Sequence, residues 1–171
     1  MKCAIDNTFL TLLMRPQSAV PESELGSYSQ SDVPQLLSSL KADWNERRAR
    51  VIIPTPVLAE VLVAAESGME VLNDISAFSQ FDILPFCERC ALELAIATRQ
   101  ALKDGDKRGG VKDVWQKVKL DMQIVAIAKA NGATTLYTTD NAQAAFAKQM
   151  GIRHVKSLGD LVLPSQTEMD L

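Results

Sequence analysis

The chain has 171 residues, of which 47% are hydrophobic and 23% charged, and its formal net charge at pH 7 is −3. A chain of this size is most simply one domain, residues 1–171, and its charge provides no overall positive field for nucleic acid. No apolar run reaches the roughly 18 residues of a membrane span. Asp6 interrupts the apolar stretch that a signal peptide would need, so we expect a cytoplasmic protein.

The first half of the chain alternates short apolar runs with helical patterns. Residues 3–5 predict a strand that ends at Asp6, followed by a helical turn capped around residues 7–8. The stretch 15–34, rich in proline and serine, predicts a flexible insertion. The rest of this half predicts a helix over 34–48, a strand over 51–53, and a helix over 57–65 capped by Thr55. The first of these helices has a predicted buried stripe of Leu36, Leu37, Leu40 and Trp44.

The second half continues the alternation. Its pattern predicts helices over 69–78 and 87–103, a strand over 81–86, and inward-facing Leu92, Ala95, Ile96 and Leu102. After a polar hairpin at 104–110, a helix from about 111 to 131 leads into a short buried strand before Asp140. A helix over 142–150, a strand over 152–155 and a tail over 164–171 follow. The sequence therefore predicts an α/β fold with a mainly parallel central sheet of four or five strands between layers of helices.

Four acids are predicted to meet at the carboxyl edge of this sheet. Asp6 ends the first strand, and Asp140 follows the strand near 135. Asp121 opens the helix that precedes that strand, and Glu60 lies early in the helix that leaves the strand at 51–53. Because function in open parallel sheets gathers at this edge, we expect the four carboxylates to be neighbours.

Each acid also has an ordinary structural explanation. Asp6 and Asp140 suit caps or turns, and Asp121 has Lys117 four residues before it as a possible partner. Glu60 would be a surface acid, except that its helix is apolar on nearly all sides and supplies no cation at helical spacing. The convergence of all four favours a metal site, and oxygen ligands alone suit Mg²⁺ or Mn²⁺. Such an ion polarises a phosphoryl group and lowers the pKa of water.

The ordered set of motifs resembles the PIN-domain ribonucleases, and most closely the bacterial VapC-type toxins. The set comprises Asp6-Asn7-Thr8, Pro56 to Leu62 around Glu60, Asp121 to Ala126, and Thr138-Thr139-Asp140. The resemblance implies a PIN-like three-layer sandwich and a metal-dependent endoribonuclease. It also implies that the four acids bind Mg²⁺ or Mn²⁺ and that Thr8 supports the site. The family further implies an RNA substrate, a homodimer and restraint by an antitoxin protein.

Three features depart from the compact toxins. The insertion at 15–34 and the hairpin at 104–110 lengthen this chain. Gln143 stands where the family often has an aromatic residue, three positions after Asp140. We expect these departures to affect the toxin subtype and the substrate more than the chemistry.

Basic residues gather just before Asp121. Lys112, Lys117 and Lys119 could hold phosphates near the metal, or could belong to a solvated helical hairpin. Trp115 could stack a base, although core packing is the ordinary role of a single tryptophan.

Other site types and functions find less support in the sequence. Cys87 and Cys90 have the spacing of a redox pair or half a zinc site, but no second pair completes a zinc site, which favours a structural role. His154 lies on a predicted strand and is not needed as a base. A haloacid-dehalogenase-type phosphatase would need a second Asp where Thr8 stands. The alternative from another class is a PIN-like module that binds RNA or protein without cleaving it.

Two experimental expectations follow from the sequence. Asp6→Asn should abolish cleavage and leave the fold intact. Because crowded carboxylates repel one another without metal, Asp140→Asn should raise the melting temperature in EDTA.

Overall fold

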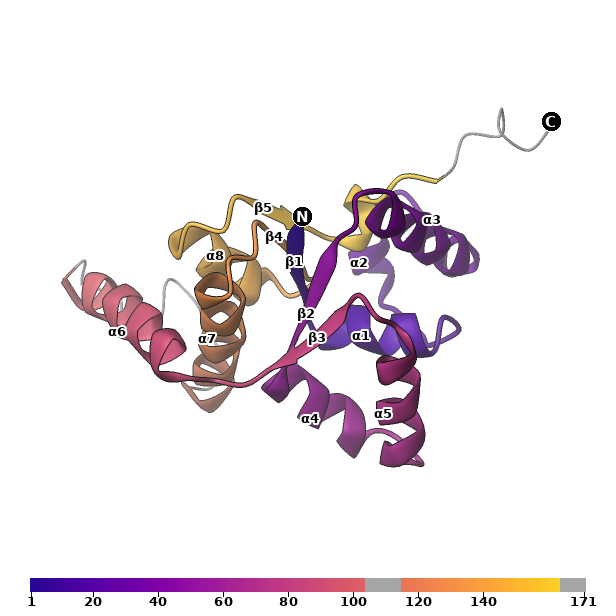
Figure 1. The fold of residues 1–171 in the computed structure, drawn as a ribbon. Helices are drawn as coiled ribbons and strands as arrows, with labels where there is room; N and C mark the ends of the chain where they lie inside the picture. Colours follow the sequence, from indigo (N-terminus) through magenta and orange to yellow (C-terminus); the bar gives the residue numbers. More distant parts are fainter. Residues whose placement is uncertain (104–114, 164–171) are drawn as a thin grey trace.

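The computed structural model describes residues 1–103 and 115–163, and its central element is a five-stranded sheet (Figure 1). The strands are β1 (Lys2–Ile5), β2 (Arg50–Pro54), β3 (Phe81–Leu84), β4 (Thr135–Tyr137) and β5 (His154–Lys156). Their order is β3-β2-β1-β4-β5, and every pair is parallel. The predicted α/β class and parallel sheet are confirmed.

Both faces of the sheet are covered, which explains why β1 and β2 carry apolar runs without alternation. Side chains at successive positions of the central strands point to opposite faces of the sheet and belong to two separate cores. Ile5 and Ile53 belong to one core, whereas Ala4, Ile52 and Leu136 belong to the other. The molecule is therefore a three-layer sandwich, as predicted.

The first core is closed by α1 (Asn7–Met14), α3 (Val33–Glu46), α4 (Thr55–Val63) and α5 (Gly68–Ala77). The predicted buried stripe of α3 is confirmed, since Leu36, Leu37, Leu40 and Trp44 are all buried. The predicted cap of α4 is wrong, because Pro54 is the N-cap and Thr55 is already helical.

The stretch 15–34 contains two short helices, α2 (Glu22–Leu25) and η1 (Gln30–Asp32). Its Tyr28 hydroxyl donates a hydrogen bond to the Leu161 carbonyl across 2.7 Å. Gly26 has φ 64°, and a Cβ added there would lie 3.0 Å from the Cα of Gly159 in η2 (Leu158–Asp160). This stretch thus contacts the last described segment of the chain.

The second core is covered by α6 (Glu88–Lys103), α7 (Trp115–Ala130) and α8 (Asn141–Gln149). Gly132, with φ 78°, follows the end of α7, and the predicted stop there is confirmed. The part of the predicted helix before residue 115 and the hairpin at 104–110 lie outside the described residues, as does the tail at 164–171.

The predicted inward face of α6 is wrong. Leu92, Ile96 and Leu102 are 62%, 57% and 55% exposed, and the buried residues of α6 are Cys90 and Ala101. The helix lies along α7 rather than on the sheet, so only a narrow strip of its surface is covered (Figure 1).

Across the described ranges, no helix is both long enough and apolar enough to span a membrane.

Candidate functional site

The parallel strands bring their carboxyl ends to one edge, and the predicted acids lie around it. Asp6 directly follows β1, and Asp140 follows β4. Glu60 lies on α4, which leaves the end of β2, and Asp121 lies on α7, which contacts α4. Asp121 is inside α7 and not at its start, because that helix already begins at Trp115.

Asp6 is held rigidly at the start of α1. Its side chain is 2% exposed, and Oδ1 accepts a hydrogen bond from the Phe9 backbone N–H across 2.8 Å. Oδ2 accepts from the Thr139 N–H across 3.1 Å. Asp6 is thus the N-cap of α1, the role that the sequence had suggested for residues 7–8. Burial outweighs these hydrogen bonds and raises the pKa of Asp6 from 3.8 to about 6.

Thr138 connects two of the acids. Its side chain is 2% exposed, and its hydroxyl accepts the Asp140 backbone N–H across 3.0 Å. The same hydroxyl hydrogen-bonds to the Asp6 carboxylate and lowers its pKa. A hydroxyl can donate one hydrogen bond while it accepts another, so Thr138 fixes Asp6 and Asp140 relative to each other.

Asp140 has protein partners for both carboxylate oxygens. Oδ1 caps α8 by accepting the backbone N–H groups of Ala142 and Gln143 across 2.7 and 3.1 Å. Oδ2 lies 2.9 Å from the Lys117 ammonium. Although partial burial acts in the opposite direction, the hydrogen bonds from Lys117 and from α8 hold the pKa of Asp140 below its usual value. Helical spacing had suggested an ion pair between Lys117 and Asp121. In the structure, Lys117 instead pairs with Asp140.

Asp121 is buried but only partly hydrogen-bonded. Its side chain is 4% exposed, and Oδ1 accepts the Gln143 side-chain N–H across 2.9 Å. Within the described part of the chain, its Oδ2 is buried without a hydrogen-bond partner, and so is Oε1 of Gln143. Burial raises the pKa of Asp121 to about 6, with smaller contributions from the neighbouring charges of Asp140 and Glu60. A buried carboxylate oxygen without a donor is costly unless a cation lies against it.

Glu60 is half-buried, and its charge acts on Asp121. Among residues 1–103 and 115–163, no side chain or backbone group donates a hydrogen bond to its carboxylate. Partial burial raises the pKa of Glu60, and the nearby charge of Lys117 lowers it. Lys117 therefore acts electrostatically on Glu60, Asp121 and Asp140 together.

The acids influence one another, but their side chains do not close around one point. Within residues 1–103 and 115–163, no three Asp, Glu, Cys or His side chains are near enough to share a metal ion. The donors nevertheless suit a hard divalent cation, because all are carboxylates and Asp121 Oδ2 has no partner among the residues that the structure describes.

Thr8 lies in the first turn of α1, two residues after Asp6. It contributes to a small cavity of about 180 Å³ that Asn7, Thr11 and Ser18 also line. The hydroxyl that contacts Asp6 is that of Thr138, so the structure adds a second candidate for the supporting role expected of Thr8.

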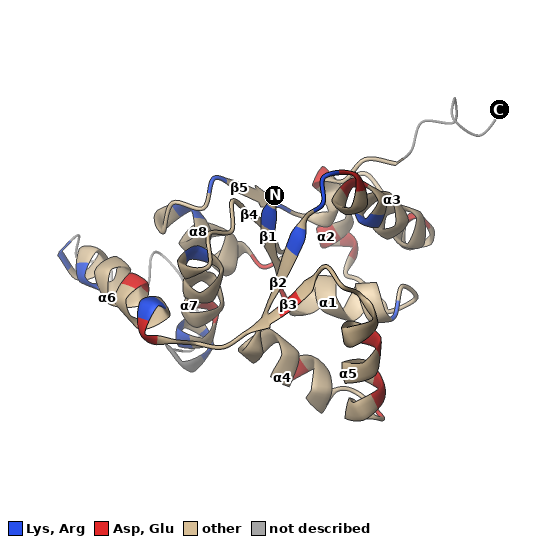
Figure 2. Cartoon of the chain, in the orientation of Figure 1, with Lys and Arg blue, Asp and Glu red and all other residues tan. Residues whose placement is uncertain are grey.

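The helices that contain or adjoin Asp121 and Asp140 carry Lys or Arg. Figure 2 shows Lys and Arg on α6, α7 and α8, whereas α4 and α5 carry acids and neither Lys nor Arg. Of the candidate phosphate-binding lysines, Lys117 and Lys119 are exposed on α7, and Lys112 lies outside the described residues.

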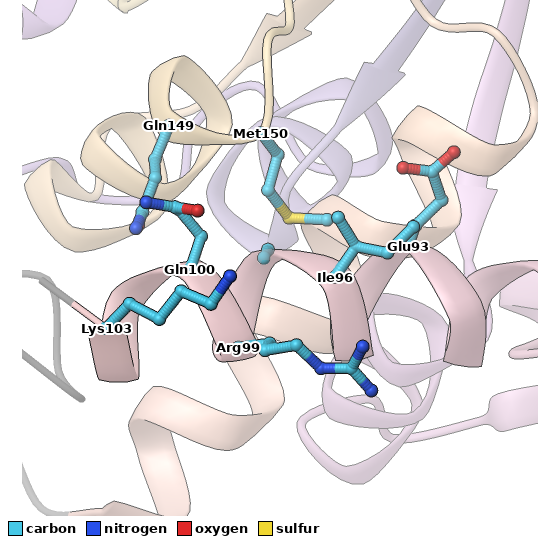
Figure 3. A pocket seen from close by; sticks show the side chains of 8 residues that line it. Glu93, Ile96, Arg99, Gln100, Lys103, Gln149 and Met150 are labelled. Carbon is cyan, nitrogen blue, oxygen red and sulfur yellow. The ribbon is translucent and has the colours of Figure 1, made fainter.

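A larger cavity of about 360 Å³ lies between α6 and α8 (Figure 3). Ile96 and Met150 form part of its wall, and Glu93, Arg99 and Lys103 bring charges to its rim. None of the four acids lines it, so we place the candidate site at the carboxylates and not at this cavity.

Sequence reasoning assigned no role to Thr138 and treated Gln143 only as a departure from a family pattern. Both are buried polar residues, and each makes a hydrogen bond to an acid from an adjacent element. Their positions near Asp140 were the available signal, but nothing in the sequence showed which acid each one contacts.

Comparisons with known proteins agree with this fold. A model of the PIN domain family matches residues 37–149, which is more than half of the chain. The structure of VapBC2 from Rickettsia felis, bound to a DNA fragment from its promoter, is similar with a TM-score of 0.56 and 14% identity, over 91% of this chain and 98% of that chain. DNA-bound VapBC from Salmonella typhimurium is similar with a TM-score of 0.53 and 16% identity, over 91% of this chain and 97% of that chain. No curated protein sequence matches the chain.

Proposed function

This chain belongs to the PIN domain family, whose members are generally nucleases, and from that premise we propose that it is an Mg²⁺- or Mn²⁺-dependent endoribonuclease. The observation that carries the proposal is the buried Asp121 Oδ2 without a donor, in a group of carboxylates at the carboxyl edge of the sheet. An acid with this environment is stabilised by a cation.

Asp6, Glu60, Asp121 and Asp140 would hold the ion. Bound there, Mg²⁺ or Mn²⁺ would polarise the phosphodiester and offset its negative charge. Asp6 and Asp121 are the better-fixed ligands, because Phe9 and Thr139 orient the first and Gln143 orients the second. Thr8 would orient Asp6 or a water molecule.

The chain's own cations would hold the substrate. Lys117 and Lys119 lie on the first turns of α7, before Asp121, and would bind backbone phosphates beside the acids. Lys112 would extend the same role. The Lys and Arg residues on α6, α7 and α8 (Figure 2) support a polyanionic substrate despite the net charge of −3.

We also propose the partners that the similar solved structures suggest. Those structures are VapBC complexes, so an antitoxin protein would restrain this chain as the toxin of a pair, and the chain would act as a homodimer in the cytoplasm. Co-expression with the protein encoded by the adjacent gene, followed by size-exclusion chromatography with light scattering, tests both the complex and the dimer.

The direct test is cleavage of a pool of single-stranded and structured RNAs in Mn²⁺, Mg²⁺ or EDTA. We expect cutting only with metal, and loss of cutting in Asp6→Asn and Asp121→Asn. Asp74→Asn is a matched control, because Asp74 is an exposed acid on α5. Circular dichroism of each variant confirms folding.

Two results would contradict the proposal. Full activity of Asp6→Asn would show that the site is wrongly assigned. Absence of cutting with either metal, while RNA or a partner protein still binds, would favour the non-catalytic binding module. That second function has one observation in its favour, namely that the described acids do not close around a common point.

A further inference from the structure

The connection between β3 and α6 carries a pair of cysteines that the proposed nuclease site does not use. Cys87 immediately precedes α6, and Cys90 lies in its first turn. Their sulfur atoms are 3.5 Å apart. Cys87 is exposed, whereas Cys90 is fully buried in the core beneath α6 and α7.

The start of α6 provides the Cys87 sulfur with hydrogen-bond donors. The Cys87 carbonyl accepts the first helical hydrogen bond, from the Ala91 N–H across 2.9 Å, so Cys87 occupies the N-cap position. The Cys87 and Cys90 sulfurs are 3.5 Å apart and either can donate to the other, and the Cys90 and Arg89 backbone N–H groups lower the pKa of Cys87. Donors at a helix N-terminus stabilise a thiolate, because the helix dipole is positive there.

The two sulfurs therefore differ in reactivity. Hydrogen bonds from Cys90 lower the pKa of Cys87, whereas burial raises the pKa of Cys90. Cys3 provides a contrast in the same chain: it is fully buried in β1, and burial raises its pKa to about 12. An exposed sulfur with a lowered pKa, 3.5 Å from a buried second thiol, is the arrangement of an attacking and a resolving cysteine.

We propose that Cys87 and Cys90 form a reversible disulfide by exchange with low-molecular-weight disulfides. The Cys87 thiolate attacks one sulfur of such a disulfide, and the other sulfur leaves as a thiolate with the bonding electron pair. Cys90 then loses its proton to solvent and attacks the Cys87 sulfur, which releases the second small thiol. The protein loses two protons and two electrons, and the small disulfide is reduced to two thiols.

The new bond would close the first turn of α6 without moving the helix from α7. The sulfurs are already near neighbours, and two cysteines three residues apart in a helical turn need only side-chain rotation to reach bonding distance. This site lies apart from the acids, so the inference does not depend on the proposed nuclease activity.

The test is to incubate the folded protein with oxidised and reduced glutathione at a series of ratios, then quench with acid and measure the intact mass. We expect the loss of two hydrogen atoms, reversed by dithiothreitol. In Cys90→Ser the reaction should stop at a glutathione adduct on Cys87, and in Cys87→Ser neither product should form. Cys3→Ser is the matched control and should behave as the wild type.

A second measurement separates the folded geometry from the sequence spacing alone. The unfolded chain in urea should need a severalfold more oxidising glutathione ratio than the folded protein to reach half oxidation. Equal midpoints would overturn the proposal, as would a wild-type protein that keeps the glutathione adduct like Cys90→Ser or that does not react at any ratio. Zinc retained by the purified protein and lost in both cysteine variants would also overturn it, because the pair would then be half of a shared zinc site.

Discussion

The Lys117 ammonium on α7 lies 2.9 Å from Asp140 Oδ2, at the start of α8. This ion pair links α7 to the start of α8, and the charge of Lys117 also acts on Glu60 and Asp121. A cation supplied by the chain itself thus lies among the acids that would hold a metal. It favours the ionised carboxylates, and it opposes the entry of a second cation.

Replacing Lys117 with Met should therefore strengthen metal binding. The substitution removes a positive charge that repels Mn²⁺ and pairs with one of its ligands, so we expect Mn²⁺ affinity to rise severalfold, up to about tenfold. Both partners are partly exposed, so the free energy of unfolding should change by no more than about 1 kcal/mol. Isothermal titration calorimetry measures the affinity. Lys119→Met, an exposed lysine on the same helix, is the control, and unchanged or weaker binding in Lys117→Met would contradict the competition.

Replacing Thr138 with Val should uncouple Asp6 from Asp140. The shape of the side chain is kept, but the Asp140 N–H and the Asp6 carboxylate both lose a buried partner. We expect a loss of about 1–3 kcal/mol in the free energy of unfolding and a lower rate of RNA cleavage. Thr138→Ser should restore both, because it retains the hydroxyl. If Val and Ser variants unfold and cleave alike, the hydroxyl does not position the acids.

Replacing Gln143 with Leu should make Asp121 harder to ionise. Gln143 donates to Oδ1, so its removal leaves the buried carboxylate without a hydrogen bond from the described residues. We expect the acid limb of the pH–rate profile to move to higher pH by roughly one unit. Gln149→Leu, at the exposed end of the same helix, should leave the profile unchanged. An unshifted limb in Gln143→Leu would show that Asp121 does not control the pH dependence.

The metal-free protein should lose stability as the pH rises. Burial raises the pKa of Asp6 and Asp121 from 3.8 to about 6, so the folded chain binds their protons more tightly than the unfolded chain does. Their contribution is most favourable below about pH 4, falls as the pH rises through about 6, and is constant above that range. Asp121→Asn removes one such carboxylate and should stabilise the protein in EDTA at pH 7, on the order of 1–3 kcal/mol, but not at pH 4. Thermal unfolding at both pH values decides this.

Asp140 behaves differently, and the structure reverses the expectation drawn for it from the sequence. Its pKa is lowered, because Lys117 and the start of α8 stabilise the ionised form. Its charge therefore stabilises the fold at neutral pH, and Asp140→Asn should lower the melting temperature in EDTA. The acids whose ionisation lowers the stability of the metal-free protein are Asp6 and Asp121.

Sequence reasoning located the four acids because the connectivity of a parallel sheet places strand ends at one edge regardless of side-chain detail. Glu60, for example, could be singled out from its local sequence, because its helix is apolar and has no cation at helical spacing. The contacts of these acids were beyond the sequence. Lys117 has Asp121 at helical spacing, but it pairs with Asp140, from a different element. Such pairings depend on how α7 and α8 pack against each other.

The sequence by itself determined the alternation of strands and helices, the parallel sheet and the edge where the acids meet, because these follow from hydrophobic periodicity and chain connectivity. Only the tertiary structure decided which surface of each helix is covered and which polar groups lie within hydrogen-bond reach. The apolar residues of α6 were expected inside, yet Leu92 and Ile96 are exposed, since α6 lies along α7 and the sheet is already covered. The buried Asp121 oxygen and the hydroxyl of Thr138 were decided in the same way. Burial and hydrogen bonding depend on distances between segments remote in sequence, which local patterns do not encode.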